Sequence, residues 1–166
     1  MIKWFDDVII GLKVNPQDSR IMYVGTNNRG VYKTFDRGQN WQKLEKLDEF
    51  PEAQSIETLV INQKNPDIIY TGSKQGFLKS VDGGLTWQRL NIIIPPRSLI
   101  VQSIALDKNN SSLIYYAAGN AIYHSQDGGQ SWKMYLVNST RTIKALVIDP
   151  ENSKTIYIGM TSDPEL

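Results

Sequence analysis

The sequence contains no cysteine, which excludes disulfides, thiolate metal ligands and cysteine nucleophiles. It has little net charge, because 18 Lys and Arg residues against 17 Asp and Glu residues give +1, so no overall field attracts nucleic acid or an anionic membrane. The longest uncharged apolar run, at 92–96, is too short to span a bilayer. No segment has a convincing helical period. What remains is a chain of 166 residues, 40% hydrophobic and 21% charged, a balance typical of one folded domain.

One eight-residue phrase occurs three times, at 34–41, 80–87 and 125–132. The copies begin 46 and then 45 residues apart and follow the pattern Ser/Thr-x-Asp-x-Gly-x-(Ser/Thr/Asn)-Trp. A repeat near this period is typical of folds in which one supersecondary unit stacks on the next. The phrase therefore predicts a repeat architecture.

The similarity between the copies extends upstream of the phrase. An apolar-Tyr-x-Gly/Ala element precedes each copy and occurs a fourth time near the end, with its tyrosines at Tyr23, Tyr70, Tyr115 and Tyr157. A residue interpreted as a turn former stands eight positions before each tyrosine: Asn15, Asn62, Asp107 and Asp149. Each unit thus predicts four short strands. The first is apolar and expected to be buried on both faces, and the last begins at the tryptophan.

Four-stranded units of this length are typical of propeller blades. We therefore predict an all-β fold, a β-propeller of four-stranded antiparallel blades, with about three and a half blades in a single repeat domain spanning 1–166. The expected boundaries are 8–47, 55–91 and 100–137 for the full blades, 142–160 for the half blade, and 1–7 for an extra edge strand.

A common closed propeller has about four to eight blades, so the number of blades leaves three alternatives open. The chain is a fragment, or it closes as an unusual four-bladed ring, or two chains complete one ring as a homo-oligomer. An open array would expose an apolar blade face and strand edges, which favours association.

The repeated phrase is interpreted as structural. Its aspartate accepts hydrogen bonds within the turn, its glycine supplies a positive φ, and its tryptophan packs on the blade. These residues are Asp36, Gly38, Trp41, Asp82, Gly84, Trp87, Asp127, Gly129 and Trp132. Repetition argues against a catalytic or metal-binding role, because carboxylates about one blade apart cannot converge on one ion or one bond.

The phrase resembles the Asp-box, or bacterial neuraminidase repeat. The wider pattern is similar to the propellers of sortilin, of xyloglucan-degrading glycoside hydrolases and of photosystem II assembly factors, over nearly the whole chain. The resemblance implies that the Asp-boxes lie opposite the usual binding face. It also suggests an extracytoplasmic location, although residues 1–7 do not form a signal peptide. It does not choose among hydrolase, receptor and assembly factor.

The resemblance directs the search for a site to the other face, with its loops between second and third strands and its connections at 46–54, 91–99 and 138–141. The candidate ligand-binding residues are Asn28, Arg29, Lys74, Arg97, Asn120 and Arg141. The basic members suit an anionic partner group, and the apolar, proline-stiffened segment 92–97 suits a protein contact. The alternatives are solvated loop charges and isoleucines tucked under a blade.

No catalytic set can be assigned, so the chain is expected not to be an enzyme. By resemblance, a sialidase needs an arginine triad, a Tyr–Glu pair and an acid, while a xyloglucanase needs two facing acids. Glu49, Glu52 and Glu57 are candidate acids that no spacing singles out. His124, the only histidine, is predicted to be a surface strand residue. No cofactor or metal site is predicted.

Three functions follow. The first is a non-catalytic binding or scaffold module that presents propeller loops to a protein or glycan partner. The second is a fragment of an Asp-box glycoside hydrolase, sialidase-like or xyloglucanase-like, with an incomplete active site. The third is a designed or excised propeller fragment that assembles by oligomerisation. Neither a nucleic-acid partner nor a membrane span is predicted.

Overall fold

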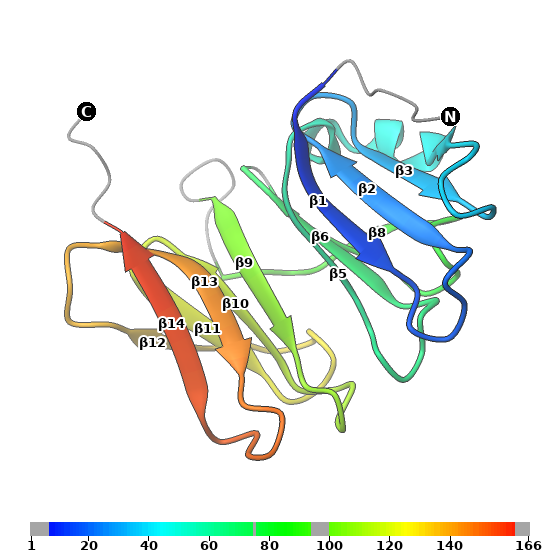
Figure 1. The fold of residues 1–166 in the computed structure, drawn as a ribbon. Coiled ribbons are helices and arrows are strands. Elements are labelled where there is room, and N and C mark those ends of the chain that lie inside the picture. Colours follow the sequence, from blue (N-terminus) through cyan, green and yellow to red (C-terminus); the bar gives the residue numbers. More distant parts are fainter. Residues whose placement is uncertain (1–6, 75, 94–99, 162–166) are drawn as a thin grey trace.

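The computed structural model describes residues 7–74, 76–93 and 100–161. Over these residues the chain forms fourteen strands in four antiparallel sheets that succeed one another along the chain (Figure 1). Three sheets have four strands in sequential order, and the last has two. The all-β, blade-by-blade prediction is therefore confirmed. Within the described part of the chain the sheets do not close into a ring.

The blades have short strands. The first contains β1 (Ile9–Val14), β2 (Met22–Thr26), β3 (Val31–Thr34) and β4 (Gln42–Lys43). The second contains β5 (Ile56–Ile61), β6 (Ile69–Ser73), β7 (Phe77–Ser80) and β8 (Gln88–Arg89). The third contains β9 (Val101–Leu106), β10 (Ile114–Ala118), β11 (Ala121–Ser125) and β12 (Lys133–Leu136). The last sheet pairs β13 (Thr142–Ile148) with β14 (Ile156–Thr161).

The connection between the first two blades differs from the predicted loop. It contains two 3-10 helices, η1 (Glu45–Glu49) and η2 (Pro51–Gln54). Pro51 occupies the first position of η2, where its missing N–H costs no intrahelical hydrogen bond. Leu47 and Ala53 anchor the two helices in the core, each 1% exposed. This burial explains why the segment is ordered without a helical period in the sequence.

The turn between the first two strands of each blade is held by one side chain. Asn15 Oδ1 accepts the backbone N–H groups of Gln17 at 2.8 Å and Asp18 at 3.2 Å. The equivalent oxygens of Asn62, Asp107 and Asp149 accept backbone N–H groups two and three residues further on in the same way. The predicted turn formers are confirmed, and the Asx turn is their mechanism.

The main apolar contacts lie between blades. Ile56, Leu59 and Ile61 of β5 are 0%, 3% and 6% exposed and join a cluster with Tyr23 and Val31 of the first blade. Residues at the same positions of β9 and β13 are buried against the second and third blades: Val101, Ile104, Ile143 and Leu146. Successive blades are thus held together by the same face of each first strand.

The first strand of the first blade is an exception. Ile9, Leu12 and Val14 occupy the positions that β5 buries, yet they are 51%, 51% and 44% exposed. At the other end of the array, Val147 of β13 is 56% exposed. The prediction of first strands buried on both faces is therefore wrong for β1 and β13. These strands belong to the two terminal sheets, and each has a neighbouring blade on one side only (Figure 1).

Candidate functional site

The Asp-box turn joins the third and fourth strands and is held by hydrogen bonds between its own side chains and backbone. In the second copy, Asp82 Oδ1 accepts the Ser80 hydroxyl at 2.8 Å and the Thr86 backbone N–H at 2.9 Å. Ser80 Oγ in turn accepts the backbone N–H of Gly84 at 2.8 Å. The turn is therefore a closed hydrogen-bond network in which the carboxylate is an acceptor.

The other two copies repeat this network. Asp36 and Asp127 each accept the hydroxyl two residues before them and the backbone N–H four residues after them. Gly38, Gly84 and Gly129 have φ values of 84°, 93° and 95°, a region that favours glycine. Arg37 has a φ of 60° where the other copies have glycine, so the first copy carries backbone strain that they lack.

The tryptophans of the phrase are not equivalent. The indole N–H groups of Trp41 and Trp87 donate to the carbonyls of Gly38 and Gly84, both at 3.0 Å. This bond holds the ring against the turn in the first two copies. In all three copies the fourth strand begins at the residue after the tryptophan, one residue later than predicted. Trp132 Nε1 is buried without a partner among the described residues, and its ring packs on Tyr116 at 4.7 Å.

Asp36 should make the protein sensitive to acid. The backbone N–H of Asn40 and the hydroxyl of Thr34 lower the pKa of Asp36 from 3.8 to about 2. A lowered folded pKa stabilises the fold above the unfolded value, and this stabilisation is lost as the pH falls from about 4 to about 2. We expect Asp36→Asn to lower the urea midpoint at pH 7 and to lose less stability between these two pH values, as followed by circular dichroism. The exposed Glu45→Gln, an equal change of charge, is the control. Parallel pH profiles for wild type and Asp36→Asn would contradict the prediction.

The opposite end of the blades carries the loops proposed to meet a ligand. We call this end the loop face; it consists of the β2–β3, β6–β7 and β10–β11 loops and the connections between blades. Antiparallel order places it at the strand ends away from the Asp-box turns. Arg29, Lys74 and Arg141 lie there and are exposed. Arg97 lies outside the described residues.

The two candidate asparagines are engaged in the fold. The Asn28 side chain donates to Asp7 Oδ1 at 3.0 Å, and its backbone N–H donates to Asp7 Oδ2 at 2.8 Å. The Asn120 side chain donates to the carbonyl of Ser139 at 2.8 Å. Ser139 Oγ also accepts the backbone N–H of Arg141 at 3.1 Å, so the structure brings Asn120 and Arg141 together. Of the predicted edge strand at 1–7, only Asp7 is described.

Sequence reasoning did not anticipate the role of η2 on the loop face. Its Gln54 carbonyl accepts the backbone N–H of Gly30 at 3.2 Å, which joins η2 to the loop that carries Arg29. On the other side, Glu52 lies against Gly76 of the β6–β7 loop, where an added Cβ would lie 2.9 Å from Glu52 Cγ. The helix thus links the two loops that carry Arg29 and Lys74. Pro51 was the one local signal for it.

Glu52 is paired rather than free for catalysis. It is 9% exposed and accepts two hydrogen bonds from the guanidinium of Arg89, which also lies over the Phe50 ring at 4.9 Å. Burial opposes ionisation, but the bonds from Arg89 lower the pKa of Glu52 below its usual value. A general acid requires the opposite shift. Glu49 forms an exposed ion pair with Lys46 at 2.6 Å.

His124 is buried, so the prediction of a surface residue is wrong. It is 9% exposed, and its ring stacks on Tyr115 with centroids 4.5 Å apart. Burial and the nearby charge of Lys133 lower the pKa of His124, which favours the neutral ring. Among the described residues, no three His, Asp or Glu side chains gather in a way that could hold a metal ion. Over the same part of the chain, no helix has the length and apolar character needed to cross a membrane.

Solved structures with the same fold include two glycoside hydrolases. An ancestral GH74 enzyme is 21% identical with a TM-score of 0.77, over 91% of this chain and 21% of that chain. The GH74 enzyme of Niastella koreensis is 21% identical with a TM-score of 0.76, over 92% of this chain and 26% of that chain. At this identity the likeness shows the fold alone.

A third structure is YCF48 from Cyanidioschyzon merolae. It is 20% identical with a TM-score of 0.62, over 85% of this chain and 47% of that chain. The chain therefore spans less than half the length of each of these three proteins. Among curated proteins, no sequence matches it significantly.

The family assignment comes from the sequence pattern as a whole. A family model described as Photosynthesis system II assembly factor YCF48, PSII_BNR, matches residues 5–163. This range includes the three Asp-box phrases and the four tyrosine elements on which the blades are built. The chain belongs to the PSII_BNR family of photosystem II assembly factor YCF48.

Proposed function

We propose that the chain is a non-catalytic binding or scaffold module whose loop face receives an anionic group of a protein partner. The main support is a difference between the two ends of the blades in hydrogen bonding and exposed charge. The Asp-box turns bond internally, whereas Arg29, Lys74 and Arg141 present exposed cations on loops that differ between blades. Cations on one face favour anionic partners and raise association rates.

The protein partner is favoured over a glycan. Membership of a family named for an assembly factor supports a role in bringing proteins together. The GH74 relatives suggest a glycan, but Glu52, the most buried of the candidate acids, is occupied by Arg89. A binding module on the loop face needs only the loops and the rigid blades that support them.

The test compares two triple variants of equal charge. Arg29→Gln, Lys74→Gln and Arg141→Gln together remove the cations of the loop face. The control variant removes three cations from the opposite end of the blades, in the turns between the first and second strands: Lys64→Gln, Lys108→Gln and Lys154→Gln. A fluorescent decapeptide of glutamate is the probe, read by anisotropy at about 50 mM salt. We expect the loop-face variant to bind at least tenfold more weakly than wild type and the control variant to change little. Because the two variants carry the same net charge, such a difference reports the position of the cations and not the total charge.

Two outcomes would overturn the proposal. Equal losses in the two variants would mean that the peptide responds to net charge and not to the loop face. The wild-type chain could instead hydrolyse xyloglucan or a sialoside, with loss of this activity in Glu52→Gln or Glu57→Gln. That result would support the alternative that the chain is a fragment of a glycoside hydrolase. Without such turnover, and with a selective loss on the loop face, the binding module stands.

We further propose that the exposed face of β1 packs against another blade, supplied by a second copy or by a longer polypeptide. Ile9, Leu12 and Val14 repeat the positions through which β5, β9 and β13 contact the blade before them. Half-exposed aliphatic side chains in such a row favour association. Replacement of Leu12 by alanine tests this proposal.

A further inference from the structure

A lysine occupies the same place in the third strand of the first two blades. Lys33 and Lys79 each lie over the ring of the blade's own tyrosine, Tyr23 at 5.1 Å and Tyr70 at 5.5 Å. Each ammonium also points at a glycine carbonyl in the Asp-box turn of the next blade. The two interfaces between full blades are thus built to one plan, and their differences can be compared residue by residue.

In the first interface the lysine has carboxylates nearby. Lys33 Nζ donates to the carbonyl of Gly83 at 2.9 Å. A Cβ added to Gly83 would lie 3.0 Å from Lys33 Nζ and 3.3 Å from Asp67 Oδ1, so the ammonium and the Asp67 carboxylate both approach Gly83. Burial lowers the pKa of Lys33, while the charges of Asp67 and Asp82 oppose this change.

In the second interface a serine takes the place of Asp67. The backbone N–H of Gly83 donates to the carbonyl of Asp67 at 2.9 Å, and that of Gly128 donates to the carbonyl of Ser112 at 3.0 Å. Ser112 is therefore the structural equivalent of Asp67. Lys79 Nζ donates to Gly128 at 3.4 Å, its one hydrogen bond to the described residues. Burial lowers the pKa of Lys79, and no carboxylate among the described residues opposes this change.

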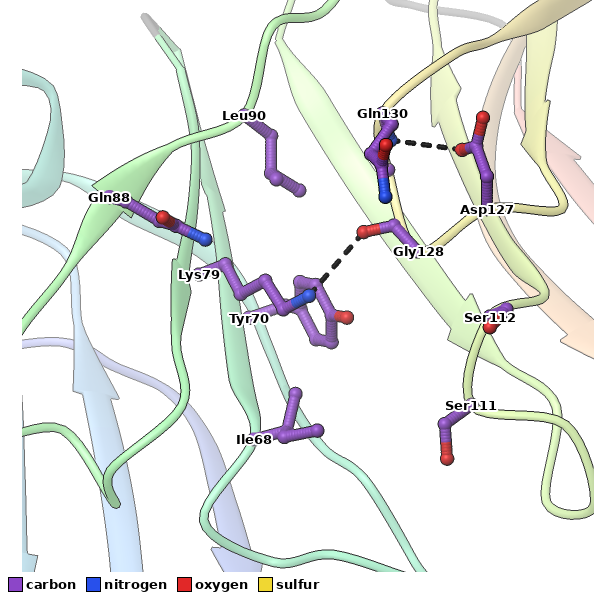
Figure 2. A pocket seen from close by; sticks show the side chains of 11 residues that line it. Ile68, Tyr70, Lys79, Gln88, Leu90, Ser111, Ser112, Asp127, Gly128 and Gln130 are labelled. Atoms are coloured by element: carbon purple, nitrogen blue, oxygen red, sulfur yellow. Dashed lines mark hydrogen bonds between the residues drawn. The ribbon is translucent and has the colours of Figure 1, made fainter.

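A cavity adjoins Lys79. Its volume is about 400 Å³, compared with about 200 Å³ for the cavity beside Lys33 in the first interface. Figure 2 shows Lys79 between Tyr70 and Gly128, with Ser112 across the cavity and the amide of Gln88 extending toward it. Ile68 and Leu90 supply apolar walls. The cavity therefore has the Lys79 ammonium and the polar groups of Ser112 and Gln88 on its lining.

Asp127, which also lines the cavity, does not neutralise Lys79. Its Oδ1 accepts the Ser125 hydroxyl at 2.7 Å and the backbone N–H groups of Gln130 and Ser131 at 2.9 Å, and its Oδ2 accepts the Ser131 hydroxyl. Figure 2 shows this carboxylate directed at Gln130, on the far side of Gly128 from the lysine. The carboxylate belongs to its own turn, as it does in the other two copies.

We propose that the cavity between the second and third blades binds a carboxylate, with the Lys79 ammonium as counter-ion and the Ser112 hydroxyl and Gln88 amide as hydrogen-bond donors. The ligand supplies the charge that Asp67 supplies in the first interface. A partly buried ammonium is costly unless it is paired, so an incoming carboxylate is stabilised there. The apolar walls suit the aliphatic stem of a glutamate side chain or of a small dicarboxylic acid. The site lies at the Asp-box end and is independent of the loop face.

The experiment uses the full chain labelled with ¹⁵N, followed by amide chemical shifts. The probes are acetyl-glutamate-methylamide, which represents a glutamate side chain of a partner, and free glutarate. We expect saturable shifts at Gly128 and Gly129 with a dissociation constant on the order of 1 mM. Ser112→Asp restores the internal counter-ion at an exposed position, and Lys79→Gln removes the cation. Each should weaken binding at least tenfold.

Two controls separate this site from others. Lys33→Gln makes the same change in the first interface and should leave the shifts unaltered, as should the triple variant of the loop face. A response to the capped glutamate alone identifies a partner's side chain as the ligand, and a response to glutarate identifies a small acid. No saturable shift with either probe would overturn the proposal. Full binding in Ser112→Asp, or equal loss in Lys33→Gln, would also overturn it.

Discussion

Leu59→Ala should lower the free energy of unfolding by about 3 kcal/mol, and Leu12→Ala should lower it by less than about 1 kcal/mol. The two leucines occupy the same position in β5 and β1, but Leu59 is 3% exposed and Leu12 is 51% exposed. Removing a buried leucine leaves a cavity between blades, whereas truncating an exposed one removes little buried area. Urea denaturation followed by tryptophan fluorescence measures both values.

This comparison also tests whether the face of β1 is covered in solution. If a second copy packs on β1, the cost of Leu12→Ala should rise with protein concentration and the sedimentation coefficient should fall in the variant. Leu146→Ala is the control for the half blade, since Leu146 is 4% exposed and should behave like Leu59. A concentration-independent, monomeric protein in which Leu12→Ala costs as little as expected would remove the proposal of association through a second copy.

Gly72→Ala should cost about 3 kcal/mol, because the second and third blades meet at Gly72 with no room for a methyl group. An added Cβ would lie 2.6 Å from Val101 Cγ1 and 2.9 Å from the Val101 carbonyl oxygen. The side chain of Val101 can rotate, but its carbonyl belongs to β9 and cannot move without displacing the blade.

Two other glycines complete a graded series. Gly25, the equivalent of Gly72 in the first blade, would place a Cβ 3.1 Å from Ile56 Cγ2, so Gly25→Ala should cost about 1 kcal/mol. Gly11 has nothing within 4 Å, and Gly11→Ala should be neutral or slightly stabilising through the unfolded state. Thermal unfolding of the three variants should preserve this order, and a Gly72→Ala protein as stable as Gly11→Ala would show that the blades can separate at no cost.

The local parts of the structure were predictable from the repeat. The tyrosine strands, the turn formers such as Asn15 and the phrase around Asp82 each depend on contacts within a few residues, so sequence spacing predicts them directly. Comparison of copies then predicts the blade, since four units with one pattern adopt one conformation. The fourth strands were placed one residue early, because the tryptophan that ends each phrase precedes the strand in all three copies.

The candidate site was harder to predict because its contacts cross between blades. Lys33 lies in β3 and Asp67 in the turn between β5 and β6 of the next blade, so their proximity is recognised only once the blades are stacked. The pairing of Glu52 with Arg89 joins a connection to a strand of the following blade. His124, by contrast, stacks on Tyr115 of the adjacent strand in its own blade, a cross-strand contact that the alternation of the sequence did not reveal.

Local sequence specifies the blade and its Asp-box turn, because both rest on hydrogen bonds and side-chain alternation over short separations. The stacking of the blades decided which apolar rows are covered, since Leu12 and Leu59 differ in the presence of a preceding blade and not in the apolar pattern of their strands. It also decided that Lys33 has a carboxylate beside it and Lys79 a serine and a cavity. Charge pairing between blades is a property of stacking, and one change from aspartate to serine leaves a cation facing the cavity between the second and third blades.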